Sequence, residues 1–159
     1  QYGYLQPVRG LCRDRVRDQL TAVQPEIATQ AVRGGDPNDR VPRPPFKDLW
    51  FRLHGDYRDD PVMNRALLVY VSDFHLVGTA TLPHGISWLR DRLMVASLDH
   101  AMWFHREFSL DDWLLYACDS PNTGGSRGLA RGLIYDRRGR LVASTAQEGM
   151  IRVLNPEES

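Results

Sequence analysis

The sequence predicts an α+β domain in which a strongly curved antiparallel sheet wraps around one long buried helix. Three observations support this fold class. A single long apolar stretch, PVMNRALLVYVSDFHLVGTA, occupies residues 61–80. Shorter segments typical of strands, separated by turn residues, lie on both sides of it. The chain has 159 residues, which is enough for one domain with a sizeable core.

Residues 61–80 are predicted to form the buried helix. At about 100° per residue, an apolar stripe follows one side with Asp73 in its middle, and the other sides are also mostly apolar. A helix that is apolar nearly all round is expected to be enclosed by protein. Asp59 or Asp60 should cap it, Pro61 should occupy its first turn, and glycines from position 78 onward should end it. The stripe comprises Val62, Ala66, Val69, Tyr70, Val77 and Ala80.

The same stretch is about long enough to span a bilayer, but its polar side chains argue against a membrane span. These are Asn64, Arg65, Asp73 and His75. A carboxylate inside a buried helix is costly unless it is hydrogen-bonded or paired. Asp73 is therefore the first candidate for a functional residue.

The charge balance and the cysteines narrow the class of protein. Basic and acidic side chains number 20 each, so no overall field attracts nucleic acid or an anionic membrane. Cys12 and Cys118 lie far apart and form no metal-spaced cluster. One disulfide is conceivable, but a reduced intracellular protein is the favoured interpretation. No signal peptide or lipidation motif is recognised.

Two strands are predicted before the helix. Residues 1–22 form a lead-in segment, and a short amphipathic helix is expected at 11–23. Residues 26–32 and 48–53 are typical of strands, the first of them weak. The glycines and prolines of residues 34–45 predict a loop between them.

Four antiparallel strands are predicted after the helix, at residues 93–106, 113–119, 128–135 and 140–153. The first of them is expected to bulge at residues 100–103. Turns are predicted at 121–125 and at 136–139. The domain would thus span 23–154, with a polar tail at 155–159.

The last predicted strand has one aliphatic face, which we assign to the core. Gln147 belongs to this face, whereas its neighbour Glu148 belongs to the other. Gln147 should therefore point towards the helix that carries Asp73, and two inward polar groups on neighbouring elements make a candidate site. A purely structural hydrogen bond between them explains the pattern equally well. The outward face also carries Val142, Ala146 and Met150.

Other polar residues are harder to interpret. Ser97 lies on a strand expected to flank the helix, but the apolar alternation there does not decide which way it faces. The sequence GGSRG at 124–128 matches a nucleophile elbow, yet no helix follows it, so Ser126 is not expected to be a nucleophile. Arg127 would instead be available to a phosphate. His100 and His105 would lie on opposite faces of a strand, which is unsuitable for a metal pair.

Five segments resemble the C-terminal half of the acyl-CoA thioesterase II family, which includes bacterial enzymes and peroxisomal relatives. They are VYVSDF (69–74), LPHG (82–85), ASLDHAMWFHR (96–106), WLLYACDSPNTGGSRGLARG (113–132) and ASTAQEG (143–149). The resemblance implies a hot-dog fold and hydrolysis of acyl-CoA thioesters to a free fatty acid and CoA, without a metal or cofactor.

The resemblance also implies roles for individual residues. Asp73, Ser97 and Gln147 would bind and activate the hydrolytic water, with Asp73 accepting its proton. Asp99 and His100 would hold the strand or turn near Ser97.

Ser126 and Arg127 are further candidates for contacts with the acyl-CoA substrate. In this family two hot-dog domains share one chain, whereas this sequence holds one. A second hot-dog domain is therefore the expected partner, either an N-terminal half or another copy in a homo-oligomer. The chain lacks a Ser-Lys-Leu tail, so a cytoplasmic rather than peroxisomal location is expected.

Two other functions remain as alternatives. The first is a non-catalytic hot-dog module that binds acyl-CoA or supports a partner subunit. The second is a hydratase of enoyl-CoA with an Asp/His pair. Asp73 and His75 lie about 200° apart on the helix, and this geometry disfavours a hydratase.

Overall fold

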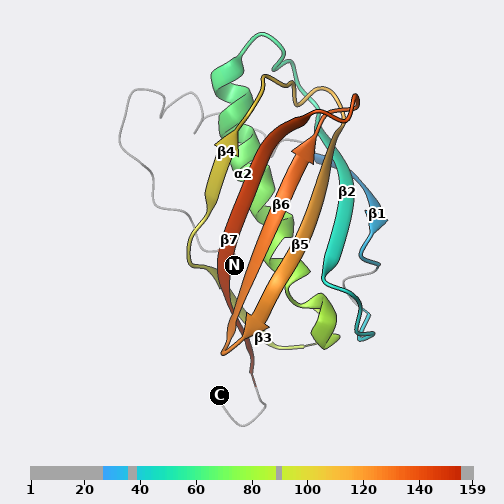
Figure 1. Ribbon diagram of the computed structural model, residues 1–159, viewed down its shortest axis with the longest axis vertical. Helices are drawn as coiled ribbons and strands as arrows, with labels where there is room; N and C mark the ends of the chain where they lie inside the picture. Colours follow the sequence, from blue (N-terminus) through green and yellow to red (C-terminus); the bar gives the residue numbers. More distant parts are fainter. Residues whose placement is uncertain (1–26, 36–38, 89–90, 155–159) are drawn as a thin grey trace.

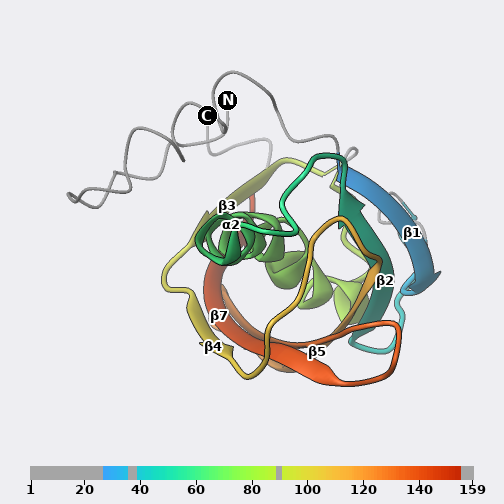
Figure 2. The same cartoon turned by 90° about the horizontal axis from the view of Figure 1, so that it is seen from above.

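The computed structural model describes residues 27–35, 39–88 and 91–154, and these form a seven-stranded antiparallel sheet curled around helix α2 (Pro61–Thr79). Figure 1 shows α2 against the long central strands, and Figure 2 shows the sheet as an arc with α2 on its inner side. The predicted α+β class is confirmed. The strands are β1 (Ile27–Arg33), β2 (Phe46–Leu53), β3 (Leu93–Ser97), β4 (Ala101–Phe104), β5 (Leu114–Gly124), β6 (Arg127–Tyr135) and β7 (Leu141–Val153). The lead-in segment 1–22, the helix predicted at 11–23, Cys12 and the tail 155–159 lie outside the described residues.

The strands follow the spatial order β1-β2-β5-β6-β7-β3, and β4 also pairs with β7. Strand β7 is long enough to pair with β3 through one part and with β4 through another. The single strand predicted at residues 93–106 is therefore wrong. The chain leaves the ladder at Leu98–His100, where the N–H groups of Leu98 and Asp99 both donate to the carbonyl oxygen of Glu148, at 2.9 and 3.5 Å. Five strands follow the helix, not the four that were expected.

Helix α2 begins as predicted. The carboxylate of Asp60 accepts a hydrogen bond of 2.9 Å from the N–H of Met63, and Pro61 occupies the first turn. The helix ends at Thr79. A short 3₁₀ helix, η1 (Leu82–His84), follows and closes with Gly85 in the left-handed conformation.

The prediction that α2 is buried all round is wrong. The buried face is a different stripe, consisting of Met63, Asn64, Leu67, Leu68, Val71, Ser72, Leu76, Val77 and Thr79. Val62, Val69 and Phe74 are 54%, 40% and 51% exposed. The sheet covers only one side of α2, so the second apolar face that the sequence carries stays open in this chain (Figure 2). By length and composition the stretch Pro61–His84 could cross a bilayer, and half of its most apolar window is buried inside the structure.

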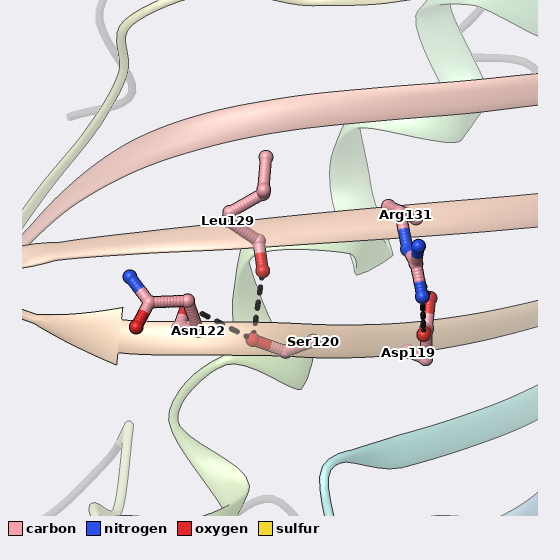
Figure 3. A network of polar contacts seen from close by, with 5 residues as sticks. All are labelled: Asp119, Ser120, Asn122, Leu129 and Arg131. Carbon is pink, nitrogen blue, oxygen red and sulfur yellow. Dashed lines mark hydrogen bonds and ion pairs between the residues drawn. The ribbon is translucent and has the colours of Figure 1, made fainter.

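Strand β5 continues through Pro121, so the turn predicted at residues 121–125 is misplaced. A bulge between Asp119 and Asn122 accommodates the proline, which has no N–H to give to a ladder. Figure 3 shows how side chains bridge this region: the hydroxyl of Ser120 donates to the carbonyl oxygen of Leu129 at 2.8 Å. Beside it, Arg131 forms an ion pair with Asp119. The actual turn between β5 and β6 is formed by residues 125–126.

The predicted facing of β7 is confirmed at most positions, because Ala143, Thr145, Gln147 and Ile151 are buried. Val142 is the exception, since it was expected to face outward and is fully buried in the core. A register irregularity between Ile134 and Tyr135 of β6 pairs Tyr135 with Leu141. This local irregularity breaks the simple alternation, so that two successive residues of β7 contribute to the core.

Candidate active site

Three polar side chains from three elements meet at one edge of the sheet. The Nε2 group of Gln147 on β7 donates a hydrogen bond to the carboxylate of Asp73 on α2, and another of 2.7 Å to the Oγ atom of Ser97. Ser97, the last residue of β3, donates in turn to Oδ1 of Asp73 at 3.1 Å. Each member of this triad therefore contacts the other two.

The strand register explains why these side chains meet. Ser97 pairs with Gly149, and Gly149 lies two residues after Gln147, so both side chains lie on the same face of the sheet. The helix can approach because Gly149 has no side chain: a Cβ atom there would lie 2.8 Å from a methyl group of Val77. Val77 lies one helical turn after Asp73, so this close contact brings the carboxylate towards Gln147.

The triad passes from the core to the surface. Gln147 is fully buried, Asp73 is half-buried and Ser97 is exposed. The site therefore opens at the edge formed by β3, where a substrate could reach Asp73 without entering the core. The structure thus corrects the expected enclosure of Asp73: this carboxylate lies beside the open face of α2 rather than inside a closed helix environment.

The donors and acceptors in the triad fix its chemistry. Because an ionised carboxylate only accepts, the amide nitrogen of Gln147 must face Asp73. Both amide protons are then used, and the buried Oε1 atom of Gln147 has no partner among the residues that the structure describes. The same described residues offer no donor to Oδ2 of Asp73. Oδ2 of Asp73 is thus the triad acceptor that has no donor and belongs to a partly exposed side chain, whereas Oε1 of Gln147 is buried.

Asp99 and His100 bind the residues next to the triad rather than the triad itself. The carboxylate of Asp99 accepts a 2.7 Å hydrogen bond from the N–H of Glu148, which follows Gln147. Nε2 of His100 lies 2.9 Å from Oγ of Ser72, which precedes Asp73. Since the hydroxyl of Ser72 donates to the carbonyl oxygen of Val69 at 2.9 Å, His100 must be the donor to Ser72.

A second layer behind the triad was not anticipated from the sequence. The hydroxyl of Tyr116 on β5 donates to the carbonyl oxygen of Ser72 at 3.1 Å and lies 3.0 Å from Oγ1 of Thr145. Burial raises the pKa of Tyr116 well above 10.0, so this hydroxyl stays protonated. The one sequence signal for this layer is Gly132, because any side chain there would overlap the Tyr116 ring.

Ser126 and Arg127 lie apart from the triad, in the turn between β5 and β6 and at the start of β6. This turn joins two strands, so it lacks the helix that a nucleophile elbow requires. Both residues line a cavity, and Arg127 lies 3.5 Å from the carboxylate of Glu148.

His75 does not join Asp73. Its Nδ1 atom lies 3.4 Å from Nζ of Lys47 on β2. Burial, with the charge of Lys47 as a second cause, lowers the pKa of His75 to about 4. His75 is thus neutral and held on the β2 side of the helix, which argues against an Asp73–His75 pair. Cys118 is also buried there, and burial raises its pKa to about 12, so it is a protonated, unreactive thiol.

Among the described residues, no group of three or more His, Cys, Asp or Glu side chains is arranged to hold a metal ion. The triad itself offers a carboxylate, a hydroxyl and an amide. Such a set can orient a water molecule and accept a proton from it.

Comparisons with known proteins point to one family. A family model described as acyl-CoA thioesterase matches residues 19–150. The chain is 37% identical over 149 residues to acyl-CoA thioesterase 2 of Haemophilus influenzae, which covers 93% of this chain and 51% of that protein. A crystal structure of the acyl-CoA thioesterase II TesB2 from Mycobacterium marinum matches with a TM-score of 0.68 and 34% identity, over 100% of this chain and 57% of that one.

The hot-dog fold predicted from the sequence is confirmed by the same comparisons. A protein of unknown function with a hot-dog fold from Alicyclobacillus acidocaldarius matches 81% of this chain and 46% of its own, with a TM-score of 0.59. Its identity of 15% bears on the fold alone. The chain spans about half the length of the thioesterases that it matches.

Proposed function

Because this chain belongs to the acyl-CoA thioesterase family, we propose that it supplies the residues that hydrolyse an acyl-CoA thioester to a free fatty acid and CoA. The observation that carries this proposal is the mutual hydrogen bonding of Asp73, Ser97 and Gln147 at an open edge of the sheet. These are a carboxylate and two neutral partners, the groups needed to activate water.

In the proposed reaction Asp73 is the general base. It takes a proton from a water molecule while the water oxygen bonds to the thioester carbonyl carbon. The carbon–sulfur bond of the resulting tetrahedral intermediate then breaks, and its electron pair leaves with the sulfur. The proton held by Asp73 passes to this sulfur, which yields the thiol of CoA and the free acid. No covalent acyl-enzyme forms, in keeping with the absence of an elbow at Ser126.

Ser97 and Gln147 orient this water and the base. The two donors to Oδ1 of Asp73 hold the carboxylate in one orientation and leave Oδ2 to accept the proton. Gln147 acts here through its amide nitrogen, which holds Asp73 and Ser97, because its Oε1 atom is buried. Asp99 and His100 are positioning residues in this scheme, because they fix the backbone of β7 and the side chain of Ser72 beside the triad.

The partner in this proposal is a second hot-dog domain, from an N-terminal half or from another copy of the chain. The open face of α2 and the edge strands β3 and β4 carry large apolar side chains that are exposed in this chain. They are Val62, Val69, Phe74, Met94, Trp103 and Phe104. Exposed apolar area next to an unpaired strand edge is typical of an interface. The matched relatives contain as much chain again as this one.

A hot-dog module that binds acyl-CoA without hydrolysing it is the second candidate function. This chain spans half of its relatives, and Ser97 is exposed at the edge where a second domain would lie. A half-site would still bind acyl-CoA without turning it over. The cytoplasmic location expected from the sequence stays a prediction.

Replacement of Asp73 tests the proposed function. We expect Asp73→Asn to lower the release of CoA from a medium- or long-chain acyl-CoA at least about a hundredfold, a common loss when a general base is removed. The matched control is Asp112→Asn, an exposed carboxylate away from the triad. Hydrolysis within about threefold of the wild type in a folded Asp73→Asn protein, measured with an N-terminal half present, would contradict the assignment of Asp73 as the general base.

A further inference from the structure

Two cavities flank the turn between β5 and β6. The larger, about 500 Å³, lies between this turn, η1 and the last residues of β7, and His84 is in its wall. The smaller, about 210 Å³, includes Leu98. Ser126, Arg127 and Arg152 line both cavities, and we call the combined feature the β5–β6 cleft.

The cleft carries positive charge. Arg152 makes no ion pair with an acidic side chain in the part of the chain that the structure describes, and Arg127 has one carboxylate, Glu148, at 3.5 Å. The side chain of Arg127 is 63% exposed, and an ion pair so long and so solvated contributes about 0–1 kcal/mol. Both guanidinium groups are therefore available to an anion, and their planar forks suit phosphate oxygens.

The backbone at the turn provides an independent observation. Residues 125 and 126 have φ angles of 59° and 61°, the arrangement of a type I′ hairpin turn. Within the described residues, Ser126 is the only non-glycine residue with a positive φ. Glycine would adopt this conformation without strain, so Ser126 carries a cost in conformational free energy that glycine would avoid. Backbone strain of this kind is concentrated at sites that hold ligands. The residue that bears the strain is the one that lines both cavities.

We propose that the β5–β6 cleft binds the phosphate groups of CoA, an inference that rests on the proposed function in identifying the ligand. The smaller cavity begins at Leu98, one residue after Ser97 of the triad. Along β7, Gln147 and Arg152 are five residues apart, a span of ~17 Å in an extended strand, and they face opposite sides of the sheet. The ligand would therefore pass over the edge strand β3 at Ser97 and Leu98, the second of which lines the smaller cavity. The pantetheine arm that joins the thioester to the diphosphate of CoA is a chain of similar length. The thioester can thus lie at the triad while the phosphates lie between Arg127 and Arg152.

The test measures binding of CoA, dephospho-CoA and pantetheine to the full chain by calorimetry. We expect the double variant Arg127→Gln/Arg152→Gln to weaken CoA binding at least tenfold and to leave pantetheine binding unchanged. The matched control is Arg138→Gln, which removes one positive charge from the turn between β6 and β7, at the other end of the sheet. Equal effects of the double variant on CoA and pantetheine, or no CoA binding by the wild type, would overturn the proposal.

Dephospho-CoA identifies the phosphate that is bound. If its affinity equals that of CoA, the diphosphate occupies the cleft. If the wild type binds dephospho-CoA only as weakly as the double variant binds CoA, the 3′-phosphate occupies the cleft. Both results support phosphate binding in the cleft, and they differ in which phosphate group of CoA is bound.

Two further variants separate binding from folding. Ser126→Gly should raise the midpoint of thermal unfolding, because it removes the strained conformation, and yet weaken CoA binding. Glu148→Gln should strengthen CoA binding, because it removes the anion that competes for Arg127. Weaker binding caused by Glu148→Gln would contradict the proposal.

The cleft and the proposed hydrolysis can fail separately. If the cleft variants lose CoA affinity but the wild type, together with an N-terminal half, hydrolyses no acyl-CoA, the proposed function fails and the cleft stands. If hydrolysis depends on Asp73 while the cleft variants bind CoA like Arg138→Gln, the cleft fails and the proposed function stands.

Discussion

The carboxylate of Asp99 accepts a 2.7 Å hydrogen bond from the backbone N–H of Glu148. This bond ties the break between β3 and β4 to the residue directly after Gln147. Two residues before Asp99, Ser97 donates to Asp73. One short segment of chain therefore provides a hydroxyl to the triad and a clamp on the strand that provides its amide.

The first prediction uses the alternation of β7. Gln147→Ala should lower hydrolysis at least about tenfold, because both donors that hold Asp73 and Ser97 are lost. Glu148→Ala, one residue away on the opposite face, should stay within about threefold of the wild-type kcat. Comparable losses in kcat from both, at equal thermal stability, would contradict the assigned role of Gln147.

The second prediction concerns His100 as a positioning residue. His100→Ala should lower kcat roughly tenfold with little change in KM, because the Ser72 side chain beside Asp73 loses its donor. His105→Ala is the matched control, since Nε2 of His105 also lies 2.9 Å from a serine hydroxyl, that of Ser144, but at an exposed site. A merely structural role would lower the unfolding midpoint and leave kcat of the folded protein unchanged.

Part of the candidate site can be predicted from local sequence patterns. The alternation of β7 places Gln147 inward, and the carboxylate in an apolar helix marks Asp73, because both patterns are local. The facing of Ser97 stays undecided from the sequence, since β3 is a short edge strand in which small residues occupy both faces. The break after Ser97 depends on bonds to Glu148, 50 residues away, which no local pattern contains. The open side of α2 escapes prediction for a related reason, because in the sequence the apolar residues of an exposed helix face look the same as core residues.

The third prediction tests the open face of α2. At micromolar concentration the chain alone should self-associate through a two-fold contact, as light scattering would show by the mass. Val69→Lys, on the open face, should shift the protein towards monomer, whereas Val32→Lys, on the exposed far-edge strand β1, should not. We expect weak acyl-CoA hydrolysis unless an N-terminal half is present. A strictly monomeric and fully active chain would show that one domain suffices.

The fourth prediction is a pH dependence of stability. The pKa of His75 is lowered from 6.5 to about 4 in the folded chain, so the unfolded state gains a proton first as the pH falls. Folding stability should therefore fall between about pH 6.5 and pH 4, by up to ~3 kcal/mol from this residue. His75→Gln should flatten this part of the curve of urea midpoints against pH. His54→Gln, at an exposed histidine, should leave it unchanged.

The buried thiol of Cys118 has a practical consequence. It is 2% exposed, and its raised pKa keeps it from forming the thiolate that reacts with alkylating reagents. In a Cys12→Ser background, alkylation of Cys118 would have to wait for the sheet to open around it. The labelling rate would then report the opening free energy of the core at β5, in the same way that hydrogen exchange does for a backbone amide. A ligand that bound only the native state would slow this rate by mass action, so the chain contains its own reporter for any candidate substrate.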